Sequence, residues 1–192
     1  MSVAPSTDRG RATRERILDA AATLFHRQGV TATGLDQVIA ASGTGKGQLY
    51  HYFADKRELV HAVIERQVAT VLDAQRPRLE QLSTPADLRA WADELVESYA
   101  QGDHPVRCPL GALAAELAEG DPEARAALER GFALWADALA DGLRRLELAL
   151  APEQVATALL CAYQGGLLLS QVRGDLAPLR TALDVALTTA GA

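Results

Sequence analysis

Residues 33–58, TGLDQVIAASGTGKGQLYHYFADKRE, constrain the fold of this chain more than any other stretch. The pattern predicts a short apolar helix, then a turn that contains Gly43, and then a second short helix of small and polar residues. Another helix begins abruptly at Asp55. This is the layout of a helix-turn-helix, whose second helix enters the major groove of DNA. The segment therefore predicts that the chain binds nucleic acid.

The rest of the chain is predicted to be helical throughout. Ala and Leu dominate the sequence, β-branched runs are scarce, and 48% of the residues are hydrophobic, which is enough for a substantial core. Apolar residues recur at three- and four-residue spacing between breaks at Gly and Pro, which predicts nine helices and no strand. The expected fold class is all-α, with a three-helix head followed by a helical body.

The net charge of −6 argues against DNA binding until its distribution is considered. Residues 1–66 hold 9 Lys and Arg against 7 Asp and Glu, whereas residues 67–192 hold 10 against 18. This division fits a head that reads DNA joined to a body that does not. We expect an unstructured tail at residues 1–10, a helix-turn-helix domain at 11–54 and a separate body at 55–192.

Several classes of protein are excluded by what the sequence lacks. It has no run of about 18 uncharged apolar residues, and its N-terminus lacks the apolar core of a secretory signal. Two cysteines imply no disulfide framework, so we expect a cytoplasmic protein without a membrane partner. No catalytic triad or carboxylate pair can be assembled, and no zinc-ligand spacing occurs. We expect neither an enzyme nor a metal nor a cofactor.

The second helix of the motif has the surface that a DNA-reading helix needs, because it is thin and carries hydrogen-bonding groups. Gly45 and Gly47 permit close backbone approach, and Gln48 suits an adenine edge. Leu49 should face inward, with Phe53 beneath the helix. The predicted DNA-contacting residues are Thr33, Thr44, Gly45, Lys46, Gly47, Gln48, Tyr50, His51 and Lys56, with phosphate contacts added by Arg11, Arg14 and Arg16.

The starts of three helices are also predicted from capping patterns, and one of them is an N-cap and N1 pair at Thr84-Pro85. Thr33 is expected to begin the first helix of the motif, with Asp36 three residues later, and its free N–H groups suit a phosphate. Asp55 is expected to cap the helix after the motif, with Glu58 completing a capping box. At Thr44-Gly45, glycine is a weak cap, and Thr44 is a candidate substitute.

Two other interpretations of SGTGKGQ compete with DNA reading. A phosphate-binding loop needs four residues between Gly and Gly-Lys, then Ser or Thr, all after a buried strand. Here Gly47 follows Gly45-Lys46, and a helix precedes them, so nucleotide binding is disfavoured. The other alternative is a structural helical hairpin with a solvated polar face, which the surrounding pattern also disfavours.

The spacing of the N-terminal residues resembles that of the TetR family of bacterial transcriptional regulators. The resemblance covers about a quarter of the chain and follows Arg14 to Ala22, Leu24-Phe25, Gly29, Thr33, Ile39-Ala40, Ser42-Gly43, Lys46-Gly47, Leu49 to Phe53, Asp55-Lys56 and Glu58-Leu59. It implies an all-α, dimeric and usually repressive protein, whose C-terminal domain binds a small molecule that releases DNA. The family often has Val-Ser where this chain has Thr44-Gly45, and Ala or Thr in place of Gln48, so the operator sequence is not implied.

A second resemblance lies in the body. The segment from Arg107 to Ala118 and the later Tyr163-Gln-Gly-Gly-Leu-Leu-Leu resemble the TetR branch that regulates drug-efflux and detoxification genes. The expected function is that of a homodimeric repressor released from a palindromic operator by a small apolar or aromatic effector. The alternative from another class is a small-molecule-binding protein or enzyme with a vestigial helix-turn-helix.

The last two helices are the predicted dimer interface. Half-sites read by such heads lie about 34–36 Å apart, which requires a two-fold symmetric protein. Small residues permit close helix approach, and leucines add apolar area. The predicted interface residues are Ala158, Ala162, Gly165, Gly166, Leu179, Leu183 and Leu187.

Large side chains of the body are predicted to form an effector pocket with a few polar anchors. The candidates are Trp91, Leu95, Tyr99, His104, Leu113, Phe132, Trp135, Tyr163 and Gln164. The alternative for each of them is a place in an ordinary core.

Cys108 is a candidate redox or electrophile sensor, which is a further alternative for how the repressor is released. It follows Arg107 at a predicted helix start, and both features favour the reactive thiolate. The competing interpretation is an unreactive, partly buried thiol. Cys161 lies among apolar residues and is expected to be inert.

Overall fold

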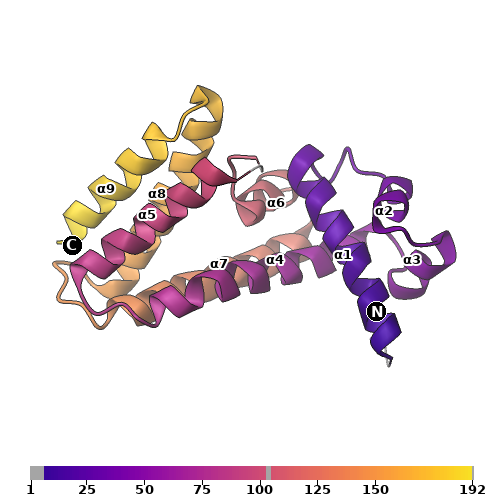
Figure 1. The fold of residues 1–192 in the computed structure, drawn as a ribbon, viewed down its shortest axis with the longest axis horizontal. Helices are drawn as coiled ribbons and strands as arrows, with labels where there is room; N and C mark the ends of the chain where they lie inside the picture. Colours follow the sequence, from indigo (N-terminus) through magenta and orange to yellow (C-terminus); the bar gives the residue numbers. More distant parts are fainter. Residues whose placement is uncertain (1–6, 103–104, 192) are drawn as a thin grey trace. The chain divides into compact units, whose positions relative to one another are not determined.

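The computed structural model describes residues 7–102 and 105–191. In this part of the chain it contains nine helices and no strand, so the all-α prediction is confirmed. The helices, shown in Figure 1, are α1 (Asp8–Gln28), α2 (Leu35–Ser42), α3 (Lys46–Tyr52), α4 (Lys56–Leu79), α5 (Pro85–Gln101), α6 (Pro109–Leu117), α7 (Pro122–Leu143), α8 (Pro152–Arg173) and α9 (Ala177–Ala190).

The helices divide into two compact units. The head unit comprises Met1–Ala69 with Ala112–Glu129, and the body unit comprises Thr70–Gly111 with Arg130–Ala192. This division differs from a single boundary after residue 54, because α4, α6 and α7 each contribute residues to both units. Sequence patterns show where a helix begins, but they do not show which neighbours each of its turns will contact.

The head is built on a small apolar core from its first three helices. Ile17 and Phe25 of α1, Val38 of α2 and Leu49 of α3 are buried, as is Phe53 directly after α3. Burying a side chain of this size contributes about 1.5–3 kcal/mol. The predicted inward direction of Leu49 and Phe53 is therefore confirmed, and their burial fixes which side of α3 faces outward.

The first helix begins earlier than the sequence suggested. We expected an unstructured tail through Gly10, whereas residues 8–10 are helical and α1 starts at Asp8. Thr7 is the N-cap, and its Oγ1 accepts a hydrogen bond from the Gly10 N–H at 3.1 Å. A capped first turn satisfies donors that would otherwise be left unpaired, which stabilises this turn. Residues 1–6 lie outside the described part of the chain.

The later N-cap predictions are confirmed. Asp55 Oδ1 accepts from the Glu58 N–H at 2.8 Å. Glu58 Oε2 accepts at 2.8 Å from the Ala54 N–H, one residue before the N-cap whose N–H a capping box would use. At the start of α5, Thr84 is the N-cap and Pro85 follows it at the first helical position. Short-range patterns of this kind need no tertiary information, which is why they can be predicted from sequence.

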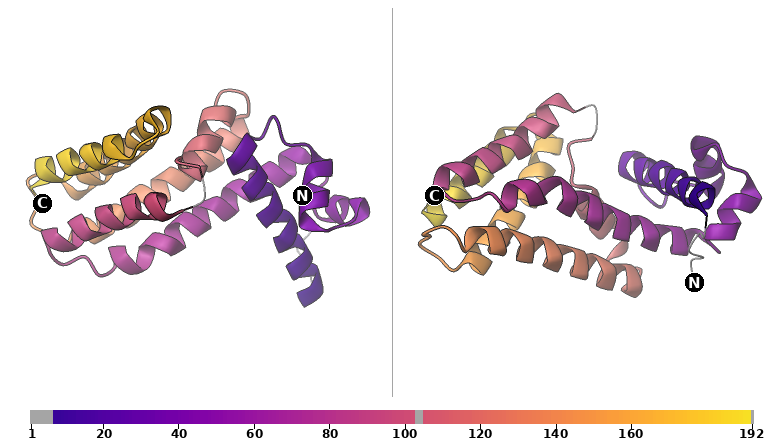
Figure 2. Two further views of the ribbon diagram at one scale, coloured as in Figure 1. Left: turned by 45° about the horizontal axis from the view of Figure 1, so that its top comes forward. Right: turned by 60° about the horizontal axis from the view of Figure 1, so that its bottom comes forward.

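In the body, α8 and α9 lie side by side along their length, as Figures 1 and 2 show. Gly166 makes this contact unusually close, because a Cβ at that position would lie 2.8 Å from the Leu179 Cα. Leu179, Leu183 and Leu187 are buried along the same contact. These four predicted interface residues therefore form the interior of the protomer and cannot present a surface to a partner. Small residues and leucines at helical spacing fit either role, and sequence alone did not distinguish them.

The opposite face of α8 is apolar and exposed. Leu168 and Val172 are 62% and 78% exposed, and Leu169 is also exposed. No charged residue occurs between Glu153 and Arg173. By length and composition α8 would pass as a membrane-spanning helix, and 39% of its most apolar window is buried in the structure. An exposed uncharged face of this kind indicates an interaction surface.

Candidate nucleic-acid interface

The outward face of α3 is polar, thin and fully available. Lys46, Gly47, Gln48, Tyr50 and His51 are all exposed, and Gly45 immediately before the helix is exposed too. Neither glycine has a positive φ, and a Cβ on Gly47 would meet nothing within 4 Å. The fold itself therefore does not require a glycine at position 47. The missing side chain of Gly47 affects only how closely another molecule can approach α3.

The two helices of the motif begin with the same hydrogen-bonding scheme. Gly34 precedes α2, and its N–H donates to Gln37 Oε1 at 2.8 Å. Gly45 precedes α3, and its N–H donates to Gln48 Oε1 at 2.9 Å. In both cases the third helical residue closes back on the N-cap, as in half of a capping box. Gln48 is therefore both a surface residue and a structural cap.

Two predicted DNA contacts are corrected by the structure. Thr33 is only 1% exposed, and its hydroxyl donates to the Gly29 carbonyl at 2.7 Å. Thr44 is 8% exposed, and its hydroxyl shares a hydrogen bond of 2.7 Å with the Ser42 hydroxyl. Neither threonine caps a helix, since Gly34 and Gly45 hold the N-cap positions. Both side chains fix the turns around the motif and do not face a ligand.

The cations around α3 fall into two groups. Lys46, whose Nζ lies 6.0 Å from the centre of the Tyr50 ring, and Lys56, at the start of α4, are the only lysines in the chain. In contrast, Arg57 pairs with Asp121 at 3.1 Å and Glu123 at 3.2 Å. Its bond to Asp121 raises the pKa of the Arg57 guanidinium. The lysines are therefore the better candidates for phosphate contacts.

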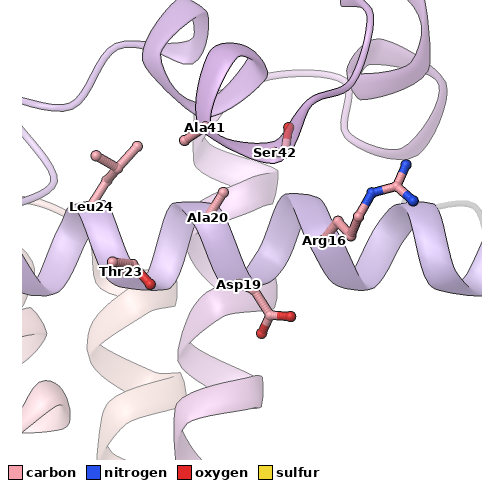
Figure 3. Close-up of a pocket in the computed structure, with 7 residues that line it drawn as sticks. All are labelled: Arg16, Asp19, Ala20, Thr23, Leu24, Ala41 and Ser42. Atoms are coloured by element: carbon pink, nitrogen blue, oxygen red, sulfur yellow. The ribbon is translucent and has the colours of Figure 1, made fainter.

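The arginines of α1 are placed less favourably for DNA than we expected. Arg11 pairs with Asp8, and the Arg14 guanidinium lies 5.3 Å from the centre of the Phe53 ring. Arg16 is exposed beside a groove of about 370 Å³ between α1 and α2. Figure 3 shows Leu24 and Ala41 facing this groove while the Asp19 carboxylate points away from α2. Of the residues predicted to contact DNA, only Arg16 lines this groove.

A contact that sequence reasoning missed holds the loop between α1 and α2. The Glu116 carboxylate of α6 accepts hydrogen bonds from the N–H groups of Val30 at 2.7 Å and Thr31 at 2.5 Å. Burial acts to raise the pKa of Glu116, but the bonds from Thr31 and Val30 outweigh it and lower that pKa. Gly29 has φ of +88°, and a Cβ there would lie 3.1 Å from Glu116 Oε2. No local pattern signals a contact between residues 85 positions apart.

In the body unit, four of the predicted pocket residues form one aromatic cluster. The Tyr99 and Tyr163 hydroxyls are hydrogen-bonded at 2.8 Å. The Tyr163 ring meets Trp135 edge-on, with their ring centres 5.5 Å apart. Trp135 stacks on Phe132, with their ring centres 6.3 Å apart. Burial raises the pKa of Tyr99 to about 12 and the pKa of Tyr163 well above its ordinary value. Both hydroxyls therefore stay neutral near pH 7.

The other predicted pocket residues are placed as follows. Trp91 is 3% exposed, and its indole N–H has no acceptor among the described residues. Gln164 lies beside the Cys108 thiol, and Leu95 is half-buried. Leu113 is buried in the head unit, and His104 lies outside the described residues. Unpaired buried donors are rare and indicate a place where an acceptor is expected.

Cys108 occupies a buried site at the start of α6. It is 3% exposed, and burial raises the pKa of its thiol despite hydrogen bonds from Gln164 and from the backbone of Gly111 and Leu110. These are the features of an unreactive thiol, whereas Arg107 and the helix start suggested a reactive thiolate. Cys161 is instead exposed on α8. Among the described residues, no group of three or more His, Cys, Asp or Glu is arranged to hold a metal ion.

Comparisons with known proteins match nearly the whole chain. A family model described as "Bacterial regulatory proteins, tetR family" matches residues 17–63, and one described as "Transcriptional regulator LmrA/YxaF-like, C-terminal domain" matches residues 85–185. An uncharacterised HTH-type transcriptional regulator of Lactococcus lactis is 33% identical over 93% of each chain. The HTH-type transcriptional regulator LmrA of Bacillus subtilis is 30% identical over 86% of this chain and 90% of its own length.

Solved structures show the same fold. The reduced form of NemR from Escherichia coli superimposes with a TM-score of 0.80 at 24% identity, covering 91% of this chain and 95% of that one. The regulatory protein TetR from Rhodobacter sphaeroides gives a TM-score of 0.78 at 22% identity, covering 92% and 98%. At these identities the agreement concerns the arrangement of the helices.

The open surroundings of Gly47 lead to a prediction with opposite effects on stability and binding. Gly47→Ala should raise the free energy of unfolding by about 0.5–1 kcal/mol, because alanine favours the helix and no atom obstructs its Cβ. The same methyl group should obstruct DNA and weaken its binding roughly tenfold or more, which equals about 1.4 kcal/mol. Denaturant unfolding and a fluorescence-anisotropy titration measure the two effects.

Gly120→Ala is the matched control, since a Cβ there also meets nothing within 4 Å. It should leave DNA affinity unchanged. Equal DNA affinity for Gly47→Ala and the wild type would show that the backbone of α3 does not approach DNA closely.

Proposed function

The chain belongs to the TetR family of bacterial transcriptional regulators, and we propose that it is a homodimeric repressor that a small apolar or aromatic effector releases from a palindromic operator. The observation that carries this proposal is the two-sided helix α3. Its inner side is anchored in the head core, and its outer side offers only small, polar and cationic groups. That combination suits a helix that lies in a major groove.

The DNA-contacting surface proposed for this chain is narrower than the sequence suggested. It consists of the exposed residues of α3 and its N-cap together with the first residue of α4, namely Gly45, Lys46, Gly47, Gln48, Tyr50, His51 and Lys56. Lys46 and Lys56 supply phosphate contacts, which position the head without reading sequence. The glycines and Gln48 supply the approach to the bases.

The two lysines give the first test of this surface. Lys46→Ala and Lys56→Ala should each weaken binding to operator and unrelated DNA alike, because phosphate contacts carry no sequence information. Each substitution should lower the slope of log affinity against log salt by about 0.9, which corresponds to one phosphate contact. Anisotropy titrations at several salt concentrations measure this slope on DNA from the protein's own promoter region.

Arg180→Ala, an exposed arginine of α9, is the control and should leave the salt slope unchanged. Since the chain has only two lysines, acetylation followed by mass spectrometry gives a second readout, in which bound operator DNA protects both side chains. Lysines that are acetylated equally fast with and without bound DNA would refute the placement.

The proposed dimer surface is the exposed, uncharged face of α8 with the neighbouring part of α9. On α8 it includes Ala158, Gly165, Leu168, Leu169 and Val172. Val185 continues it on α9. A two-fold interface uses the same patch on both subunits, so an apolar patch without charges meets its own copy without desolvating an ion. Ala162 is half-buried at the edge of this face.

Leu168→Glu tests this surface. The substitution removes an apolar contact worth about 1.5–3 kcal/mol from each subunit and places two like charges near the two-fold axis. The dimer dissociation constant should rise by more than about 100-fold. Sedimentation velocity over a concentration series measures it.

The control is Leu134→Glu, since Leu134 of α7 is also an exposed leucine of the body and lies outside α8 and α9. It should leave the dimer intact. If both variants stay dimeric, or both dissociate, the partner does not dock on this face of α8.

The proposed effector site is the aromatic cluster of the body. The cluster offers the flat apolar rings of Tyr99, Phe132, Trp135 and Tyr163. The hydroxyls of the two tyrosines remain neutral. The unpaired indole N–H of Trp91 lies in the same unit and suits an acceptor group on the effector. Binding there would favour a conformation of the dimer whose heads no longer match the operator, which lowers DNA affinity by a population shift.

Both tryptophans of the chain lie in the body unit, so their fluorescence reports on this unit alone. Small aromatic compounds that release DNA should change tryptophan fluorescence over the same concentration range. Tyr163→Phe should raise the required concentration about fivefold to tenfold, the effect of one lost hydrogen bond, with unchanged DNA affinity. Release by a compound that leaves tryptophan fluorescence unchanged, or a Tyr163→Phe protein that responds like the wild type, would exclude this site.

A further inference from the structure

We propose that Gln48 reads a hydrogen-bond acceptor on a base in the major groove, with guanine as its preferred partner. This inference rests on the proposed placement of α3 against DNA and concerns which base the side chain selects. It reverses the sequence-based expectation that Gln48 suits an adenine edge.

The argument begins with the amide oxygen of Gln48, which is already engaged. It accepts the Gly45 N–H at 2.9 Å, and that donor fixes which end of the amide is oxygen. Gly45 has an extended backbone at φ −85° and ψ 155° and carries no side-chain acceptor of its own. When DNA excludes water from this surface, losing the bond would leave the Gly45 N–H unpaired, which is costly. The oxygen is therefore held, and the NH₂ group is what Gln48 presents outward.

The four bases differ in how many hydrogen-bond acceptors they offer to the NH₂ group of Gln48. Guanine offers two neighbouring acceptors, O6 and N7, whereas thymine offers only O4. Adenine pairs N7 with an N6 amino group, and a glutamine binds both only when its oxygen and its NH₂ group face the base edge together, whereas the Gln48 oxygen is directed back at the Gly45 N–H. Cytosine presents an N4 amino group, which cannot accept. An amide whose oxygen is held by the backbone therefore favours guanine and disfavours cytosine most.

The surroundings of Gln48 leave this amide accessible. A Cβ on Gly47 would meet nothing within 4 Å, and a Cβ on Gly45 would meet only Gln48 Oε1 at 3.8 Å. The two glycines flank the side chain without covering it. Gln48 is exposed, as the base-contacting residue at the N-terminal part of a recognition helix must be.

The chain contains a natural control for the capping bond. Gln37 makes the same bond to Gly34 at the start of α2, and its Oε1 also accepts from Gln28 Nε2 at 3.1 Å. Gln37 thus caps α2 in the same way as Gln48 caps α3, and its bond to Gln28 also connects α2 to α1.

The test is a selection of bound sequences from randomised duplexes by wild type, Gln48→Ala, Gln48→Glu and Gln37→Glu. One position of each half-site should show a wild-type preference for guanine of about tenfold, which Gln48→Ala removes. Gln48→Glu keeps an acceptor for the Gly45 N–H but has no donor, so its preference at that position should change to cytosine. Gln37→Glu adds the same charge to the head and should leave that preference unchanged.

A second measurement uses only the wild-type protein. Replacing the selected guanine by 7-deazaguanine removes the N7 acceptor and should weaken binding about fivefold or more, the lower part of the range for a base contact. Adenine or cytosine at the position that Gln48→Ala affects, or no affected position at all, would overturn the assignment. So would undiminished affinity for the 7-deazaguanine duplex. Absence of any sequence-selective DNA binding by the wild type would refute the placement of α3 itself.

Discussion

The burial of one side of α3 is the constraint on which the proposed DNA-contacting surface depends. A helix of seven residues has no independent stability in water, because the nucleation cost exceeds what so few hydrogen bonds return. Leu49 and Phe53, both fully buried, bind it to the head core, and the Gly45–Gln48 bond closes its first turn. Apart from that one cap, the outer side of α3 is therefore not needed to stabilise the fold. Small and polar residues can occupy it without loss to the fold.

Residues 33–58 illustrate what sequence can and cannot predict. The helical period and the burial of Leu49 and Phe53 follow from local pattern, as do the caps at Asp55 and Thr84. The role of Thr33 does not follow, because a threonine before a helix can cap it or bond back to the preceding turn, and only the path of the chain decides. The bonds of Glu116 to Val30 and Thr31 depend on which helices pack together, and no local rule contains that information.

The body shows the same limit in a different form. The apolar spacing of α8 and α9 is visible in the sequence, but it marks two faces, one toward the interior and one toward solvent. Gly166 and Leu179 lie on the first face, and Leu168 lies on the second. For Cys108, the sequence showed the features that favour a thiolate, whereas burial, which depends on tertiary packing, outweighs them and raises the pKa of the thiol.

Helix α8 contributes both to the proposed effector site, through Tyr163, and to the proposed subunit contact. The Tyr163 ring belongs to the aromatic cluster, while Leu168 on the opposite side of the same helix belongs to the proposed subunit contact. Gly166 lets α8 pack directly against the backbone of Leu179, so we expect α8 and α9 to move together. In the proposed dimer, a molecule that displaces Tyr163 in one subunit would therefore also shift the surface that contacts the other subunit. The two proposed effector sites would then be unequal after the first is filled, so occupancy would follow a cooperative rather than a simple hyperbolic curve.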